Sequence, residues 1–260
     1  MALLTEAGTK LAVLTSRTVL AATAAVTVLT AALAPAHATP VILNGSFETT
    51  TATASTEFGT RYGGAKTVAN WTTSGYNFLF QSGTADTSGA ANEYGAALKL
   101  WGPGDGSANG LPASSPDGGN FIGADGAYAQ APIQQTITGL DMNSVASITF
   151  YWAGAQQYNY NGTSTEAWQV TLGNETHSTQ VVNNAEHGFT GWQKTTLSFV
   201  VTSTTEVLSF LAIGTPSGVP PFSLLDGVSI SEVPEPTSLA LMVTGLGTAG
   251  LLSRRRRAAV

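Results

Sequence analysis

The chain has 260 residues, no cysteine and a formal net charge of −6, and 43% of its residues are hydrophobic. This length is enough for one domain with a sizeable core beside terminal targeting segments. The lack of cysteine excludes disulfides, thiolate zinc sites and cysteine-dependent catalysis.

The N-terminus has the layout of a secretory signal peptide. Basic residues precede an apolar run at 19–33, and Ala36 and Ala38 form a small-x-small cleavage site. We predict a signal helix within residues 1–38 that signal peptidase removes during export. An uncleaved N-terminal anchor is the alternative, but the run is short and a proline follows it.

Residues 39–232 form the predicted body, which is strongly acidic. It holds four Lys or Arg side chains against 14 Asp or Glu, which gives a formal charge of −10. Such a surface repels phosphates, which excludes nucleic acid as a partner. The abundance of Gly, Ser, Thr and Asn favours strands joined by turns.

The first half of the body predicts short strands separated by long loops. Tyr76, Phe78 and Phe80 alternate and would share one face of a strand. The other predicted elements are a strand and turn at 41–48, a loop at 49–60, a strand at 96–101, a glycine-rich loop at 102–119, and a strand pair at 120–124 and 133–137.

The second half carries stronger strand signals. Apolar residues alternate or run continuously over 147–154, 167–172, 197–201, 207–213 and 222–230, with turn residues between them. No segment of the body shows a useful helical period. We therefore predict an all-β body folded as an antiparallel β-sandwich.

The last residues, 233–260, contain three distinct parts in sequence. Pro234, Glu235 and Pro236 form an extended, accessible element, because neither proline fits a helix interior or a central strand. An apolar run at 237–252 would form a transmembrane helix roughly 24 Å long, slightly short of a hydrocarbon core about 30 Å thick. A basic cluster then holds the end of the chain in the cytoplasm: Arg254, Arg255, Arg256 and Arg257.

This order of parts closely resembles the PEP-CTERM sorting signal. The resemblance implies that exosortase acts at the Pro-Glu-Pro element. The protein would then pass through an inner-membrane intermediate, anchored at least transiently, before it reaches the cell surface or extracellular matrix. A permanent C-terminal anchor is the alternative.

Three stretches of the body, 44–48, 188–192 and 220–230, resemble galactose-binding-like jelly rolls, the sandwich of many carbohydrate-binding modules. The resemblance implies a structural Ca²⁺ near the first and last strands, with Glu48 and Asp226 at the matching positions. Carboxylates and carbonyls are the ligands that Ca²⁺ prefers. Gly227 stands where related sequences often carry a second acidic residue. Alternatively, Glu48 caps a turn and Asp226 accepts backbone amides.

A candidate glycan site consists of Tyr158, Tyr160 and Trp168, in or beside an Asn/Gln-rich segment at 156–161. Aromatic rings cover the apolar face of a pyranose, and amides bond to its hydroxyls. In the alternative, Trp168 belongs to the core and the tyrosines only cover a loop.

Signals for catalysis are weak. His177 and His187 lack zinc-ligand spacing and are predicted to be solvated loop residues, and no nucleophile motif occurs. Scattered acids such as Glu166, Glu175 and Glu186 offer a glycosidase pair only by chance. We therefore predict a secreted, exosortase-sorted envelope or matrix protein that binds exopolysaccharide without catalysis. A polysaccharide-acting enzyme and a purely structural or adhesive matrix protein remain alternatives.

Overall fold

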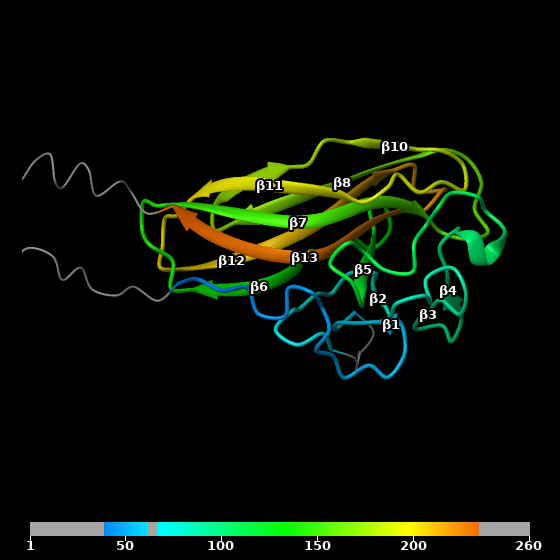
Figure 1. The fold of residues 1–260 in the computed structure, drawn as a ribbon, viewed down its shortest axis with the longest axis horizontal. Helices are drawn as coiled ribbons and strands as arrows, with labels where there is room; N and C mark the ends of the chain where they lie inside the picture. Colours follow the sequence, from blue (N-terminus) through cyan, green and yellow to red (C-terminus); the bar gives the residue numbers. More distant parts are fainter. Residues whose placement is uncertain (1–38, 62–66, 234–260) are drawn as a thin grey trace, which may run out of the picture. The chain divides into compact units, whose positions relative to one another are not determined.

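The computed structural model describes residues 39–61 and 67–233 (Figure 1). The predicted signal peptide with Ala36 and Ala38, and the tail with Pro234, Glu235, Pro236, its transmembrane helix and the four arginines, lie outside the described residues. Within the described ranges, no helix has the length and apolar character needed to cross a membrane.

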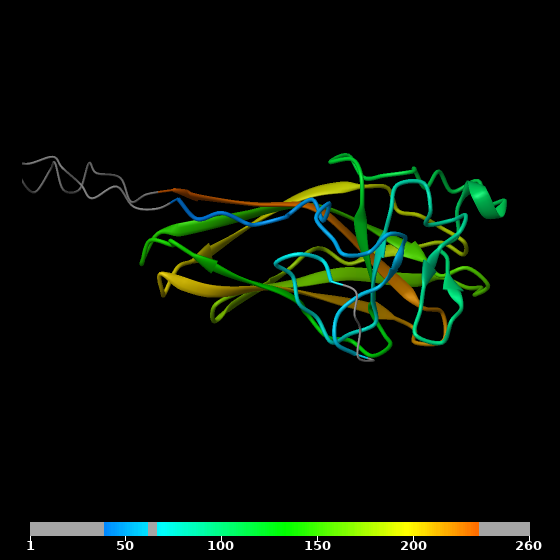
Figure 2. The ribbon, with the colours of Figure 1, turned by 90° about the horizontal axis from the view of Figure 1, so that it is seen from below.

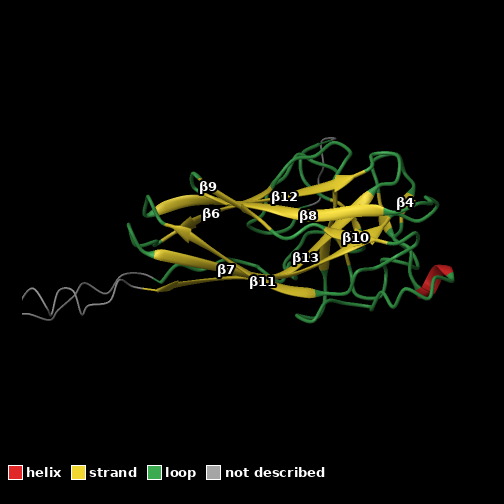
Figure 3. Cartoon of the chain, turned by 90° about the horizontal axis from the view of Figure 1, so that it is seen from above, coloured by secondary structure: helices red, strands yellow, loops and turns green. Residues whose placement is uncertain are grey.

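The body is a β-sandwich of two sheets, as predicted, and the two layers are seen edge-on in Figure 3. The larger sheet has the order β11-β7-β13-β5-β2-β1-β3-β4, and the smaller sheet has the order β10-β8-β12-β6 with β9 paired to β8. The strands of the larger sheet are β1 (Thr56–Glu57), β2 (Asn77–Phe80), β3 (Ala90–Ala91), β4 (Ala97–Leu98), β5 (Phe121–Asp125), β7 (Val145–Gln156), β11 (Gln193–Val200) and β13 (Pro221–Val233). Those of the smaller sheet are β6 (Ile133–Thr138), β8 (Ser164–Leu172), β9 (Glu175–Ser178), β10 (Val182–Asn184) and β12 (Thr205–Thr215).

The main core lies between the two sheets and follows the predicted alternation. Along β7 every second residue from Ala146 to Trp152 is fully buried, and Trp168, Val170 and Leu172 of β8 face it from the other sheet. Burying apolar area contributes roughly 25 cal/mol per Å², so this aromatic-rich layer is the main source of stability. Because the protein has no disulfide, the core must hold the sandwich together.

A second apolar cluster covers the outer face of the larger sheet. Phe78, Phe80 and Phe222 point away from the main core and are buried beneath residues of the 81–111 segment, including Leu98, Leu100 and Leu111. The glycine-rich segment after residue 101 contains a short 3-10 helix, Pro103–Asp105. The long loops therefore cover the outer face of the larger sheet, and they support the loops that carry the candidate site described below.

One strand pairing predicted in the first half of the body is wrong. The segments 120–124 and 133–137 do not pair: β5 lies between β13 and β2, whereas β6 pairs with β12 in the other sheet. All five residues of β5 are buried, which requires a central place with both faces covered, while β6 alternates between buried and exposed residues and suits a sheet edge.

The apolar start of the body is not a strand. Val41 and Leu43 are exposed, and the backbone N–H and C=O of Leu43 both bond to the side-chain amide of Gln135, each at 2.8 Å. This side chain replaces the strand partner that the sequence predicted. The segment still runs beside β13 (Figure 2), where the Val228 N–H donates to the Gly45 carbonyl at 2.9 Å.

Candidate functional site

Three aromatic rings from separate loops meet at one end of the sandwich. The Trp101 ring stacks on the His187 ring with centroids 3.8 Å apart and planes inclined by 29°. The Tyr158 ring packs against Trp101 at 4.6 Å and 60°, and the Lys99 ammonium lies 4.3 Å from the Tyr158 centroid. All three rings are half-buried, so they are fixed by one another while part of their surface meets solvent.

The backbone of His187 is held in an unusual conformation. Its φ of 55° lies in the left-handed region, which is uncommon for a residue with a side chain. Its N–H donates to Gln156 Oε1 at 2.6 Å, and its carbonyl accepts from Ser107 Oγ at 3.0 Å and Asn109 Nδ2 at 2.9 Å. A strained backbone conformation of this kind persists only where several surrounding contacts hold it in place, and such residues cluster at functional sites.

The loop between β7 and β8 is tied to the same cluster. Trp101 Nε1 donates to the Tyr160 carbonyl at 3.0 Å, and Gln156 Nε2 donates to the Gly162 carbonyl at 2.8 Å. His187 Nε2 lies 2.8 Å from Asn161 Oδ1. Gln156 is fully buried, so a single buried amide connects this loop to the segment that carries His187.

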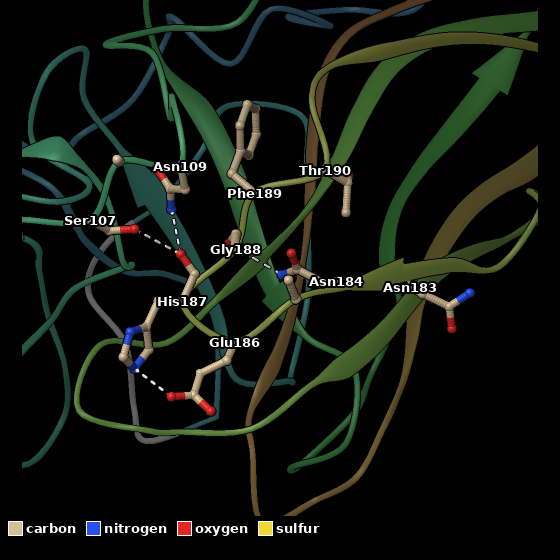
Figure 4. Close-up of a pocket in the computed structure, with 11 residues that line it drawn as sticks. Ser107, Asn109, Asn183, Asn184, Glu186, His187, Gly188, Phe189 and Thr190 are labelled. Atoms are coloured by element: carbon tan, nitrogen blue, oxygen red, sulfur yellow. Dashed lines mark hydrogen bonds and ion pairs between the residues drawn. The ribbon is translucent and has the colours of Figure 1, made fainter.

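A cavity of about 450 Å³ opens beside His187 (Figure 4). Amide and hydroxyl side chains dominate its walls, and Glu186, His187 and Phe189 add a carboxylate and two aromatic rings. Its lining includes Ser107, Asn109, Asn183, Asn184, Glu186, His187, Phe189 and Thr190. Binding sites for polar ligands combine such hydrogen-bonding groups with aromatic surface.

The site carries little net positive charge. Lys99 is paired with Asp105, whose side chain is only 5% exposed. The other basic residues of the described chain, Arg61 and Lys194, contact Glu93 and the Tyr151 ring instead. The cluster is therefore suited to an uncharged ligand.

The structure brings together two of the three residues predicted to bind glycan. Tyr158 and Tyr160 lie at the cluster, and Tyr160 is 38% exposed. Trp168 was wrongly assigned, because it is fully buried, packs edge-on against Phe210, and donates through Nε1 to the Leu224 carbonyl at 3.0 Å. No face of its ring is available to a sugar.

Trp101 and His187 are the residues that sequence reasoning missed. His187 was predicted to be a solvated loop residue, and the stacking on Trp101 corrects this. The one available signal was a tryptophan placed directly before a Gly-Pro-Gly turn, since a large aromatic at a loop edge needs a packing partner. His177 pairs instead with Glu175 on β9, at 2.7 Å.

The scattered acids occupy different settings. Glu166 is fully buried on β8, the Glu175 side chain is 36% exposed on β9, and the Glu186 side chain is 54% exposed at the rim of the 450 Å³ cavity. Two further acids, Glu57 and Glu93, share a cavity of about 140 Å³ with Arg61. Burial, together with the charge of Glu93, raises the pKa of Glu57.

The predicted calcium ligands lie near a third carboxylate. Glu48 Oε1 accepts from the Asn120 N–H at 2.6 Å, and Asp226 accepts from the Gly227 N–H at 2.8 Å and from the Ser115 hydroxyl. Burial raises the pKa of Asp226 to about 8, helped by the charges of Asp117 and Glu48.

Asp117 takes the place of a side chain at position 227. A Cβ on Gly227 would lie 3.0 Å from the Asp117 Cγ, so the loop around Asp117 brings a carboxylate to the point where the chain has only glycine. Among the described residues, no three or more His, Asp or Glu side chains are arranged as a ready metal site.

A family model for the PEP-CTERM protein-sorting motif matches residues 232–257. The match includes the Pro-Glu-Pro element, the apolar run and all four arginines, which confirms the predicted sorting signal. The motif implies recognition by exosortase and export to the cell surface. No curated protein matches the chain.

Several solved structures match the chain at low sequence identity, with TM-scores below 0.5. An arabinose-bound α-L-arabinofuranosidase shares 12% identity with a TM-score of 0.40, and the match covers 75% of this chain and 27% of that enzyme. The chain thus spans about a quarter of that enzyme's length.

Two smaller matches are carbohydrate-binding modules. One is TmCBM61, solved with β-1,4-galactotriose, at 13% identity and TM-score 0.32, covering 64% of this chain and 90% of the module. The other is the CBM22-1 xylan-binding domain of Paenibacillus barcinonensis Xyn10C, at 14% identity and TM-score 0.30, covering 69% and 92%. Similarity at this level assigns no ligand to the present chain.

Proposed function

We propose that this exported protein binds exopolysaccharide at the cell surface or in the extracellular matrix, without catalysis, through the cluster of Trp101, Tyr158 and His187 and the adjoining cavity. Aromatic surface covers the apolar face of a sugar ring, and the amides and hydroxyls of the cavity supply partners for sugar hydroxyls. The rings are already fixed by their neighbours, so little side-chain entropy is lost on binding.

The observation that carries this proposal is the strained backbone of His187, which several hydrogen bonds hold in place. Three hydrogen bonds hold its φ at 55°, and the result is a ring stacked on Trp101 beside the cavity. A loop that served only to connect β10 and β11 would have no need of this arrangement. Pre-organisation of this kind lowers the cost of binding.

Charge favours a neutral glycan. The body carries a formal charge of −10, and Asp105 neutralises Lys99, the one Lys or Arg at the cluster within the described part of the chain. A polyanionic polysaccharide would be repelled, most strongly at low ionic strength. We therefore expect binding to neutral chains that changes little with salt.

The test is to titrate the secreted protein with neutral polysaccharide purified from the producing cells, using isothermal calorimetry. Trp101→Ala and Tyr158→Ala should each weaken binding about tenfold or more, which corresponds to about 1.4 kcal/mol. Tyr151→Ala is a matched control, because Lys194 lies 5.5 Å from that ring in a similar arrangement on β7. Equal affinity in all four proteins would refute the assignment of the site.

We also propose that Ca²⁺ binds at Glu48 and Asp226, with backbone carbonyls as further ligands and with the charge of Asp117 nearby, at a place where no group of three acids is preformed among the described residues. The support is the buried, like-charged environment that raises the pKa of Asp226, because a divalent cation would neutralise these carboxylates. Calcium should raise the melting temperature of the wild type and have less effect on Asp117→Asn. An unchanged melting temperature with calcium or a chelator would contradict this proposal.

A polysaccharide-acting enzyme is the second candidate, and the cavity shared by Glu57 and Glu93 favours it. A carboxyl with a raised pKa beside a second carboxyl resembles an acid and base pair. The assay is release of reducing ends by the wild type, Glu57→Gln and Glu93→Gln. Activity that is lost in both variants would replace the non-catalytic proposal, and no release by the wild type would exclude this candidate.

A purely structural or adhesive role would give a different result. The secreted protein would then associate with itself at micromolar concentration while no polysaccharide binds, and sedimentation and calorimetry on the same sample separate the two cases.

A further inference from the structure

A carboxyl group lies buried beneath the segment that carries His187. Glu166 is on β8, points between the sheets and is fully buried. Its Oε1 accepts from Ser164 Oγ at 2.5 Å, and its Oε2 is buried with the Asn184 amide near the carboxyl but without a hydrogen bond of good geometry. A buried acid that lacks half of its partners is costly in the charged form.

Both ends of the segment 184–190 are fastened around this carboxyl. At one end Asn184 is buried, pairs with Ser164 in the sheet and donates through Nδ2 to the Gly188 carbonyl at 3.2 Å (Figure 4). At the other end Thr190 exchanges two hydrogen bonds with Gly154 of β7, at 2.8 and 2.9 Å. The segment between them forms a wall of the cavity and presents His187.

Gly154 leaves the space that the carboxyl fills. A Cβ at this position would lie 2.5 Å from Glu166 Oε2 and 3.1 Å from Thr190 Cγ2. The Glu166 carboxyl, β7 and the end of the segment therefore meet at one point. A change in the position or hydration of the carboxyl must displace Thr190. Tightly packed interiors transmit such changes because few voids absorb them.

Among the residues that the structure describes, no charged side chain faces Glu166. The groups around it are Ser164 on its own strand, Asn184 on β10, Gly154 on β7, Thr190 on the segment, and Gly214, its register partner on β12. The titratable residues of the segment, Glu186 and His187, lie 3.7 Å from each other with partly exposed side chains. Burial raises the pKa of Glu166 to about 7, although Ser164 and Asn184 act in the opposite direction.

We propose that Glu166 is a positioning residue that couples glycan binding to a proton: neutral Glu166 holds the segment 184–190 in its binding conformation, and ionisation releases it. This inference rests on the proposed binding function. An ionised carboxylate at this point has no counter-charge, so its burial costs free energy. That cost falls if the contacts of Asn184 and Thr190 loosen and water reaches the carboxylate. The ring of His187 would then lose its fixed place on Trp101.

The test is the affinity of the secreted protein for neutral polysaccharide between pH 6 and pH 8. If the ionised form does not bind, the wild type should bind about tenfold more weakly at pH 8 than at pH 6. Glu166→Gln keeps the neutral shape and should bind with nearly equal affinity at both values. Glu175→Gln, on exposed β9, should retain the tenfold loss, because the pKa of Glu175 is lowered by hydrogen bonds and it stays ionised over this range.

A loss of affinity at pH 8 that persists unchanged in Glu166→Gln would overturn the inference and leave the proposed function intact. If Glu166→Gln does not fold, Ser164→Ala replaces it. Removing that donor raises the pKa of Glu166, so the loss of affinity should move to higher pH, and an unmoved profile would count against the coupling.

A second measurement does not depend on the glycan. In the unliganded protein, the backbone amide NMR signals of residues 184–190 should shift with a midpoint near pH 7 in the wild type and lose this transition in Glu166→Gln. This result would support the coupling even if no polysaccharide binds, whereas signals that do not respond to Glu166 would overturn it.

Discussion

Replacing Gln156 with alanine tests how the site is assembled. Gln156 is fully buried, accepts from the His187 N–H at 2.6 Å and donates to the Gly162 carbonyl at 2.8 Å. The substitution leaves both backbone groups without a partner. An unpaired buried polar group costs about 1–3 kcal/mol, and both bonds are only partly buried, so we expect a loss of about 2–3 kcal/mol in the free energy of unfolding.

Affinity should fall as well, because His187 would no longer be held at its left-handed φ. Strain of this kind is worth about 1–3 kcal/mol, which corresponds to about 5- to 150-fold in the dissociation constant. The two quantities are measured by urea unfolding of the secreted protein and by calorimetric titration with neutral polysaccharide.

Gln135→Ala is the matched control. This buried glutamine also holds a distant loop by two bonds of 2.8 Å to the Leu43 backbone, but at a different place in the fold. It should lose a similar free energy of unfolding while its affinity for glycan is unchanged. If Gln156→Ala loses stability but binds as the wild type does, the reasoning that this amide positions the site is refuted.

Three further predictions concern stability and processing. Trp168→Phe should destabilise the protein by about 1–3 kcal/mol, because it removes the donor to the buried Leu224 carbonyl and leaves a cavity in the core, and it should leave glycan affinity unchanged; a large change in affinity would return Trp168 to the site. Burial raises the pKa of Asp125 to about 6 from 3.8, despite bonds from the Ala127 and Tyr128 amides. The folded state therefore keeps its proton longer than the unfolded state, so stability should fall as pH rises from about 4 to 6. Asp125→Asn should remove this part of the pH dependence in urea unfolding, and an unaltered slope would contradict the assignment. Finally, mass spectrometry of the surface protein should show a C-terminus that ends near Pro234–Glu235–Pro236 and lacks the arginines, whereas a full-length tail would contradict exosortase processing.

The sequence predicted the sandwich because period-two alternation is local information. Ile148, Phe150 and Trp152 lie on one face of β7 because the pleat of a strand places them there, and the same holds for β8 and β12. Where both faces of a strand are covered, as in β5, alternation vanishes, and the pairing with β6 was predicted wrongly for this reason.

The site could be predicted only in part, because its residues come from irregular loops far apart in the chain. Tyr158 and Tyr160 were identified by composition, since they lie among amide side chains. The contact of Asn109 with His187 bridges 78 residues of sequence, and no spacing rule connects such positions. Their meeting depends on the second apolar cluster, which places the glycine-rich segment over the sheet.

The most direct test of the account is a titration of the secreted, isotope-labelled protein with neutral polysaccharide fragments, followed through the indole N–H signals of its five tryptophans in NMR spectra. We predict that the Trp101 signal shifts with saturation while the signals of the buried Trp152 and Trp168 stay in place. An unmoved Trp101 signal under conditions where the polysaccharide binds would contradict the proposed site.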